Sequence, residues 1–182
     1  MKVLQDMDIG ELAAFICNVL SNHGIECVLT GGACVSIYSN NRYQSGDLDF
    51  IETGESKRSK IKDILSGIGF EEYNRYFKRK DVKYFIEFPS GPLSIASERV
   101  NEISEIEFST GILKLLSPTD CVKDRLAAYY FWDDKESLEQ AYLVATVQEI
   151  NINEIARWSK KENCTGKFNQ FKKLLIKNKN EA

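Results

Sequence analysis

Two aspartates that are one residue apart have the type and spacing to bind a metal ion. Asp47 and Asp49 lie in residues 45–51, a short segment that also carries apolar side chains. Side chains at positions i and i+2 of a strand project from one face, so both carboxylates stand side by side while Leu48 and Phe50 enter the core. Neighbouring carboxylates repel each other unless a cation intervenes, and such oxygen ligands suit Mg²⁺ bound with substrate phosphates. The alternative is an edge strand whose acidic face meets water.

A pair of glycines precedes these aspartates and has the form of a phosphate-binding turn. Gly31 and Gly32 lie between an apolar segment and a short helical segment, residues 33–38. Glycine lets the backbone approach an anion closely, and a helix start offers unpaired N–H groups and a positive dipole end. Ser36 and Ser45 lie near these residues in the chain and are further candidates for the same site. A purely structural turn is the alternative for the glycine pair.

A third carboxylate, Glu87, lies in a segment that is otherwise apolar and aromatic, residues 84–89. A buried charge is unfavourable there without a partner. If this segment forms a strand next to Asp47 and Asp49, Glu87 ligates a second metal ion and helps to deprotonate an attacking hydroxyl. If the strand is an edge, Glu87 faces water.

The elements that must position these residues follow from periodicity and capping signals. The pattern predicts a helix that begins at Asp8 and ends at Gly24, a strand at 25–29, a helix at 33–38, a strand at 47–51, a helix at 56–68, strands at 70–77 and 82–88, and weaker strands at 106–108 and 112–116. Residues 1–116 are therefore expected to form an α+β domain.

The remainder of the chain, residues 117–182, has helical periodicity almost throughout. Ser117 and Pro118 have the cap and first-turn proline of a helix start, so a helical region is expected to begin there. The aromatic block 129–132 favours core packing over base stacking, because such rings bury a large area. Eight Lys or Arg residues and two Glu residues lie from Arg157 onward, which indicates either a solvated helix face or a surface for an anionic partner such as RNA.

The glycine pair, Asp47-x-Asp49 and the isolated Glu87 resemble the nucleotidyltransferase superfamily over residues 25–88. This superfamily includes DNA polymerase beta, aminoglycoside nucleotidyltransferases and AbiE-type abortive-infection toxins. The resemblance implies an α+β fold with a mixed sheet and flanking helices, followed by a C-terminal helical bundle. It also implies that Asp47, Asp49 and Glu87 are the catalytic carboxylates and bind Mg²⁺ or Mn²⁺.

The same resemblance implies a substrate and further binding residues. The glycine motif would hold a nucleoside triphosphate, and a nucleotidyl group would pass to a hydroxyl with release of pyrophosphate. Residues 116–128 resemble the helix that follows the catalytic domain in toxin-type relatives, where a basic residue faces the site. Arg125 takes that position and could bind a triphosphate oxygen in two places, and Lys123 is a second candidate. For both, pairing with Asp120 or Asp124 within the helix is the alternative.

Two departures from the family pattern leave a second function open. Fourteen residues separate Gly32 from Asp47, slightly more than is usual, and the third acid is Glu where Asp is often found. A catalytically inactive module that binds a nucleotide or a protein is therefore the alternative. A third function, antibiotic modification, is less favoured because residues 89–96 are apolar and small, whereas a polycationic drug requires many nearby acids.

Composition limits the cellular setting and the partners. The 182 residues have a net charge of −3, 43% apolar residues, a single histidine and five widely spaced cysteines. These values favour one compact unit with reduced thiols, working in the cytoplasm without a membrane segment, and they disfavour general binding to nucleic acid. The expected partners are a nucleoside triphosphate, an acceptor that is RNA, protein or a small molecule, and, if the chain is a toxin or defence component, an antitoxin.

Overall fold

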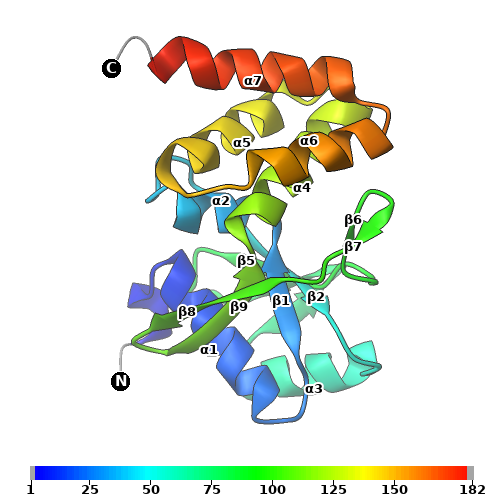
Figure 1. Cartoon of the computed structure of the whole chain (residues 1–182). Coiled ribbons are helices and arrows are strands. Elements are labelled where there is room, and N and C mark those ends of the chain that lie inside the picture. The colour runs from blue at the N-terminus through cyan, green and yellow to red at the C-terminus, as the bar shows by residue number, and fades with distance from the viewer. Residues whose placement is uncertain (1–2, 180–182) are drawn as a thin grey trace.

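The computed structural model describes residues 3–179 and has two layers of different composition. A seven-stranded mixed sheet with α1 and α3 forms one part, and helices α4 to α7 pack above it (Figure 1). The predicted α+β class, with a mixed sheet, flanking helices and C-terminal helices, is confirmed. Residues 1–2 of the predicted α+β domain and 180–182 of the predicted helical region lie outside the described residues.

The element bounds are as follows: a 3-10 helix at Leu4–Asp6, α1 Ile9–Ser21, β1 Cys27–Thr30, α2 Gly31–Tyr38, β2 Asp47–Glu52, α3 Arg58–Gly67, β3 Glu71–Tyr73, β4 Tyr76–Lys78, β5 Phe85–Glu87, β6 Ser94–Ile95, β7 Glu98–Arg99, β8 Ile103–Phe108, β9 Gly111–Leu116, α4 Pro118–Trp132, α5 Lys135–Val147, α6 Ile152–Lys161 and α7 Thr165–Lys179. The main sheet has the order β3-β4-β5-β2-β1-β9-β8, and β6 and β7 form a separate hairpin. β1 pairs in parallel with β9, and β2 pairs in parallel with β5.

Capping residues start the helices where the sequence predicts them. Asp8 accepts from the Glu11 N–H while the Glu11 side chain accepts from the Asp8 N–H, so both ends of a capping box are present at α1. At α4, the Ser117 hydroxyl accepts from the Asp120 N–H, and Pro118 occupies the first turn. Within residues 3–179, no helix is long and apolar enough to cross a membrane.

The predicted strand at 70–77 is wrong, because this segment is a tight hairpin of β3 and β4. Asn74 adopts φ 55 at the turn, a left-handed conformation that Asn tolerates better than most residues. The aromatic residues on both sides of the turn make the segment look continuous in sequence. The strand predicted at 82–88 contracts to Phe85–Glu87, whereas the weak strand signals near 106 and 112 belong to the full strands β8 and β9.

The two faces of the sheet have different surroundings. Helix α1 packs against β1 and β9, and the fully buried Leu29 and Phe50, which are paired across β1 and β2, belong to the same core cluster as Leu12 of α1. On the face of the sheet opposite to α1, cavities lie between the strands and the connection from β5 to β8, which includes the β6–β7 hairpin. We call that opposite face the open face of the sheet.

Ion pairs connect helix α6 both to the β6–β7 hairpin and to helix α4. Glu98 at the hairpin pairs with Arg157 and Lys161 of α6. Lys123, with a side chain only 8% exposed, lies 3.1 Å from the Asp120 carboxylate and 2.9 Å from the Glu154 carboxylate. Such a buried cation fixes the carboxylates around it, and its removal leaves Asp120 without this cation in a poorly solvated place, whereas Glu154 keeps Arg157 as a partner.

We expect Lys123→Met to destabilise the fold by about 2 kcal/mol, which corresponds to a melting temperature lower by roughly 6 °C. Thermal unfolding followed by circular dichroism measures this. Lys135→Met is the matched control, because Lys135 pairs with Asp133 while both side chains are more than half exposed. An exposed pair contributes roughly 0.5 kcal/mol. Equal melting temperatures for the two variants would contradict the structural role of Lys123.

Candidate active site

The three predicted carboxylates lie on the open face of the sheet. β2 and β5 pair in register, with Asp49 opposite Glu87. β1 and β2 pair with Thr30 opposite Asp49. Paired residues of neighbouring strands project from the same face, so Asp47, Asp49 and Glu87 share one face while Leu48 is fully buried behind them. The structure therefore brings together carboxylates from two distant segments of the chain.

The start of α2 is in close contact with Asp49. Gly31 has φ +68, and a Cβ atom at this position would lie 2.5 Å from the Asp49 Oδ2 atom. The Thr30 hydroxyl donates to the Asp49 backbone carbonyl at 3.2 Å. A residue other than glycine at position 31 would be strained and would displace the carboxylate. The glycine is thus required by the contact between the helix start and Asp49, whichever ligand binds there.

A chain of hydrogen bonds orients Asp47. The Ser45 hydroxyl donates to Asp47 Oδ1 at 2.7 Å, and the Ser45 N–H donates to the Ser36 hydroxyl at 2.9 Å. Ser36 in turn donates to the Gly32 carbonyl at 3.2 Å. The two predicted serines and the second glycine therefore connect α2 to Asp47. Their predicted contact with a nucleotide stays a prediction.

Burial and repulsion raise the pKa of Asp49 to about 7. Loss of hydration is the largest cause, and the negative charges of Asp47 and Glu87 add to it. The positive charge of Arg125 acts in the opposite direction. The charges of Asp47 and Glu87 thus raise the pKa of Asp49, and a divalent cation would relieve this repulsion.

Each flanking carboxylate has its own partner. Asp47 is held by Ser45, as described above, and Glu87 Oε1 lies 3.2 Å from Nε of Arg75 in the β3–β4 turn. Within residues 3–179, no three Asp, Glu, His or Cys side chains are gathered as a ready set of metal ligands. The donor type and the strand register fit Mg²⁺ or Mn²⁺, and a cation at Glu87 would compete with Arg75 for its carboxylate.

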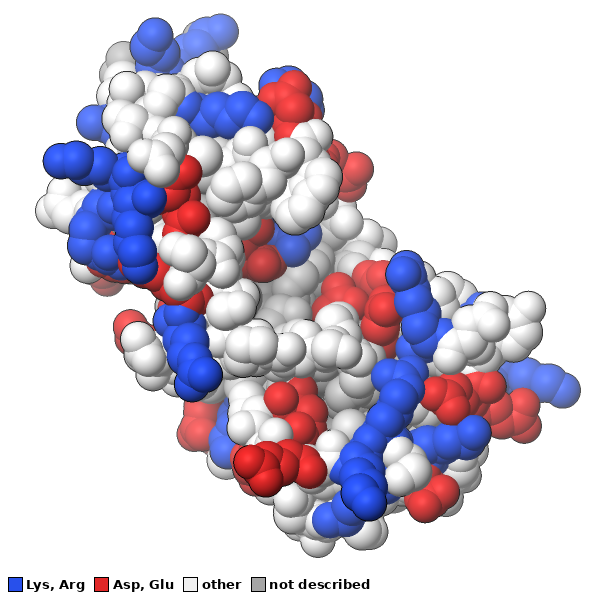
Figure 2. Space-filling view, turned by 90° about the vertical axis from the view of Figure 1, so that its right-hand side faces the viewer, with Lys and Arg blue, Asp and Glu red and all other residues white. Residues whose placement is uncertain are grey.

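A cavity of about 370 Å³ lies next to Asp49, between the sheet and α4. Its walls include Gly31 and Asp49 on one side, Pro92 and Leu93 of the β5–β8 connection, and Arg125 of α4. Figure 2 shows that this side of the molecule is hollowed between the helical region and the sheet, with acidic side chains along the hollow. A cavity of this size between two layers is a common place for a small-molecule site.

The two basic candidates have different positions. Arg125 lines the cavity while donating from Nε to Asp124 Oδ2 at 3.0 Å and from Nη1 to Gln140 Oε1 at 3.3 Å. Pairing with Asp124 does not remove it from the cavity wall. The Lys123 ammonium group contacts Asp120 and Glu154, so a nucleotide contact would require these ion pairs to open. The predicted nucleotide-binding roles of both residues stay predictions.

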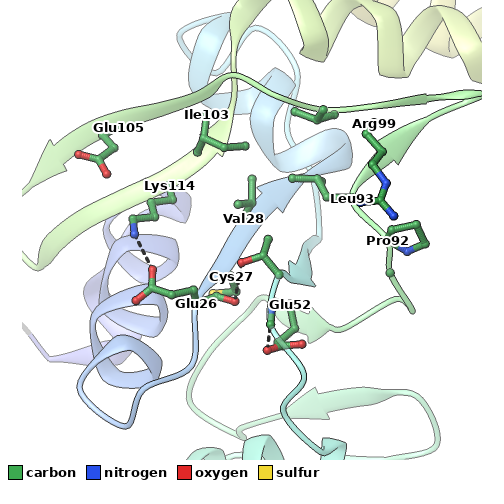
Figure 3. Close-up of a pocket in the computed structure, with 14 residues that line it drawn as sticks. Glu26, Cys27, Val28, Glu52, Pro92, Leu93, Arg99, Ile103, Glu105 and Lys114 are labelled. Carbon is green, nitrogen blue, oxygen red and sulfur yellow. Dashed lines mark hydrogen bonds and ion pairs between the residues drawn. The ribbon is translucent and has the colours of Figure 1, made fainter.

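Sequence reasoning missed a second, larger cavity on the open face, of about 700 Å³. Figure 3 shows Val28, Ile103 and Leu93 at its centre, with the Glu26–Lys114 pair at one end. It shares Pro92 and Leu93 with the cavity beside Asp49, so the two adjoin. The lining residues come from four strands and one connection, and no short sequence motif contains them.

Comparisons with models of known protein families and with curated proteins found no match. Comparison with solved structures found an antigenic nucleotidyltransferase-like protein from Paracoccidioides brasiliensis, with a TM-score of 0.57, 14% identity, and coverage of 75% of this chain and 74% of that chain. It also found the antibiotic-resistance factor ANT(2'')-Ia, with a TM-score of 0.51, 13% identity, and coverage of 96% and 97%. The chain has a nucleotidyltransferase fold.

A second structure of ANT(2'')-Ia, in complex with adenylyl-2''-tobramycin, matches at a TM-score of 0.52 with 13% identity and coverage of 85% of this chain and 93% of that chain. At these identities the likeness concerns the fold alone. The nucleotidyltransferase fold predicted from the glycine and carboxylate motifs is confirmed. The predicted likeness to AbiE-type toxins stays a prediction.

The raised pKa of Asp49 gives a prediction for the metal-free protein. Because the folded-state pKa lies above that of an unfolded aspartate, ionised Asp49 destabilises the fold, and this effect develops as pH rises from about 4 to about 7. We expect Asp49→Asn to raise the melting temperature by roughly 4 °C at about pH 8 in a chelator, and to change it little near pH 4.

Differential scanning fluorimetry at both pH values measures this effect. Asp63→Asn, at an exposed position on α3, is the control and should not change the melting temperature at either pH. Identical melting of Asp49→Asn and wild type at the higher pH would contradict the raised pKa of Asp49.

Proposed function

We propose that this protein is a metal-dependent nucleotidyltransferase that moves a nucleotidyl group from a nucleoside triphosphate to an acceptor hydroxyl. One observation carries the proposal: Asp47, Asp49 and Glu87 share one sheet face beside Gly31, in a chain with the nucleotidyltransferase fold. The two structures of ANT(2'')-Ia support the fold, not the acceptor. The proposal places the reaction in the cytoplasm.

The cavity beside Asp49 is the proposed triphosphate site. The start of α2 presents the backbone of Gly31 to the phosphates, with Gly32 next to it in the same helix start, and Arg125 lines the same cavity as a cation. Ser36 and Ser45 contribute by fixing this helix start and by orienting Asp47. Lys123 contacts the nucleotide only if its ion pairs with Asp120 and Glu154 open.

The chain's own residues would align and deprotonate the acceptor. Mg²⁺ or Mn²⁺, held by Asp47, Asp49 and Glu87, would supply Lewis-acid neutralisation of the phosphate charge. Glu87, once released from Arg75, accepts the proton of the attacking hydroxyl. The hydroxyl oxygen bonds to the α-phosphorus as the bond to pyrophosphate breaks. Catalysis would come mainly from positioning and charge neutralisation.

Removal of two of the carboxylates is expected to abolish transfer. We expect Asp47→Asn/Asp49→Asn to lower transfer by at least about 10³-fold, because the charge that develops on the phosphate loses its stabilisation. Each of the four nucleoside triphosphates, labelled at the α-phosphate, is incubated with RNA, protein and small-molecule fractions, and labelled products are separated. Asp63→Asn should retain wild-type transfer. Equal labelling by wild type and the double variant would overturn the proposal.

The alternative function is a nucleotide-binding or protein-interaction module without turnover. The pairing of Glu87 with Arg75 favours it, because this contact occupies the third carboxylate. Calorimetry separates the two functions: binding of a triphosphate without any product supports the module. Failure to bind a triphosphate argues against both.

A role as a toxin or defence component belongs to the same proposal. We expect expression in a bacterial host to slow growth, and the Asp47→Asn/Asp49→Asn variant to grow normally, because growth arrest would depend on transfer. Growth curves after induction measure this, and an antitoxin would be sought as the partner that restores growth. Normal growth with wild type, combined with raised resistance to an antibiotic, would instead favour a small-molecule acceptor.

A further inference from the structure

Aromatic and basic side chains continue the open face from Glu87 to the edge of the sheet. In β4, Tyr76 pairs with Glu87 of β5, and in β3, Tyr73 pairs with Tyr76. Phe85 pairs with Asp47 of β2. Paired residues share a face, so all these side chains lie on the same side of the sheet as the catalytic carboxylates. We call Tyr73, Tyr76, Lys78 and Phe85 the aromatic strip.

Two rings of the strip are solvent-exposed, while Tyr76 and Lys78 are half-buried. Tyr73 is 63% exposed and Phe85 is 39% exposed. The Lys78 ammonium group lies 5.0 Å from the Tyr73 ring centre and 4.4 Å from the Phe85 ring centre. Arg75 lies over the Tyr76 ring at 4.8 Å. Exposed rings such as Tyr73 and Phe85 offer surfaces on which another π-system stacks, next to cations that attract an anion.

The local charge is positive although the whole chain is negative. A hollow of about 810 Å³ adjoins the strip and is lined by several charged side chains, both basic and acidic. Arg79 in this hollow is neutralised by Asp81, and Glu72 is neutralised by Arg58 and Lys62.

The remaining charges of the hollow are three lysines, Lys78, Lys80 and Lys83, and one acid, Glu71. The excess of lysine favours an anionic ligand along the strip.

The position of the strip matches the approach of an acceptor. The proposed triphosphate cavity lies on the Asp49 side, between the sheet and α4. An in-line displacement requires the attacking hydroxyl to approach the phosphorus opposite the leaving pyrophosphate. In the sheet, β2 separates β1 from β5. Glu87 and the strip therefore lie on the other side of β2 from β1 and from the start of α2. Phe85 lies on the same strand as Glu87, and Tyr76 lies on the next strand, about 4.8 Å away, so the strip begins directly beside Glu87.

We propose that the aromatic strip binds the single-stranded end of a nucleic acid, which makes a nucleic-acid terminal hydroxyl the acceptor. This inference rests on the proposed function. Bases stack on Phe85, Tyr76 and Tyr73. The phosphates contact Lys78 of the strip, and Lys80 and Lys83 at the margin of the strip. A phosphate of the acceptor would compete with Glu87 for Arg75, so arrival of the acceptor releases Glu87 for its part in the site.

Binding is tested without nucleotide or metal, by fluorescence anisotropy. The probes are a labelled single-stranded RNA of about 12 nucleotides, DNA of the same sequence, and the duplex of each. We expect the single-stranded RNA to bind, with or without the single-stranded DNA, and the affinity to fall as the salt concentration rises. Tyr73→Ala/Lys78→Glu should weaken this binding by at least about tenfold. A second variant, Lys80→Glu/Lys83→Glu, changes only exposed side chains and should weaken binding and reduce the salt dependence.

Two matched controls locate the surface. Trp132→Ala/Lys135→Glu removes an exposed ring and an exposed lysine from the helical region and should bind as wild type does. Lys172→Glu/Lys173→Glu tests the basic C-terminal helix. The proposal is overturned if the duplexes bind as well as the single strands, if every variant loses affinity equally, if only the C-terminal variant loses it, or if no probe binds.

Failure of this inference is distinct from failure of the proposed function. Transfer of label to a protein or a small molecule by wild type, with no effect of the strip variants, contradicts the strip alone. Binding of nucleic acid at the strip by a protein that neither binds nor consumes a triphosphate contradicts the proposed function alone.

Discussion

Repulsion among three carboxylates is the interaction on which the arrangement of the site depends. Strand pairing fixes Asp49 beside Glu87, and the spacing of β2 fixes Asp47 on the same face. The backbone cannot separate these charges, so only the side chains can respond. They do so by taking different partners, Ser45 for Asp47 and Arg75 for Glu87, while burial and the neighbouring charges raise the pKa of Asp49. A divalent cation removes the same repulsion by bringing the side chains together.

The surrounding fold makes this repulsion tolerable and useful. Gly31 brings the start of α2 against Asp49, so the N–H groups and dipole of the helix lie next to the place where a phosphate would bind. The ion pair of Glu98 holds the β6–β7 hairpin against α6, and the ion pair of Lys123 with Glu154 holds α4 against α6. These contacts fix the walls of the adjoining cavity. The carboxylates are thus held by strands and helices, and the exchange of Arg75 for a cation displaces an exposed arginine side chain from the half-buried Glu87.

The sequence predicts the parts of this site that depend on local patterns. The alternation of residue types in β2 predicts that Asp47 and Asp49 share a face and that Leu48 and Phe50 are buried. The capping residues predict where α1 and α4 begin. The Asn74 turn was missed because aromatic residues flank it and suggest one strand. The contact of Arg75 with Glu87 and the aromatic strip depend on that hairpin, so neither could be derived without it. The second cavity was missed because its lining is spread over four strands.

The central claim is that Asp47, Asp49 and Glu87 converge on a cation that also holds a triphosphate. A crystal structure with Mn²⁺ and a nonhydrolysable nucleoside triphosphate tests it most directly, because the anomalous signal of manganese locates the ion independently of the surrounding atoms. The account predicts manganese between the three carboxylates, with Glu87 released from Arg75 and the triphosphate at the start of α2. A bound triphosphate without manganese at these residues, and with the Arg75–Glu87 pair intact, would contradict it.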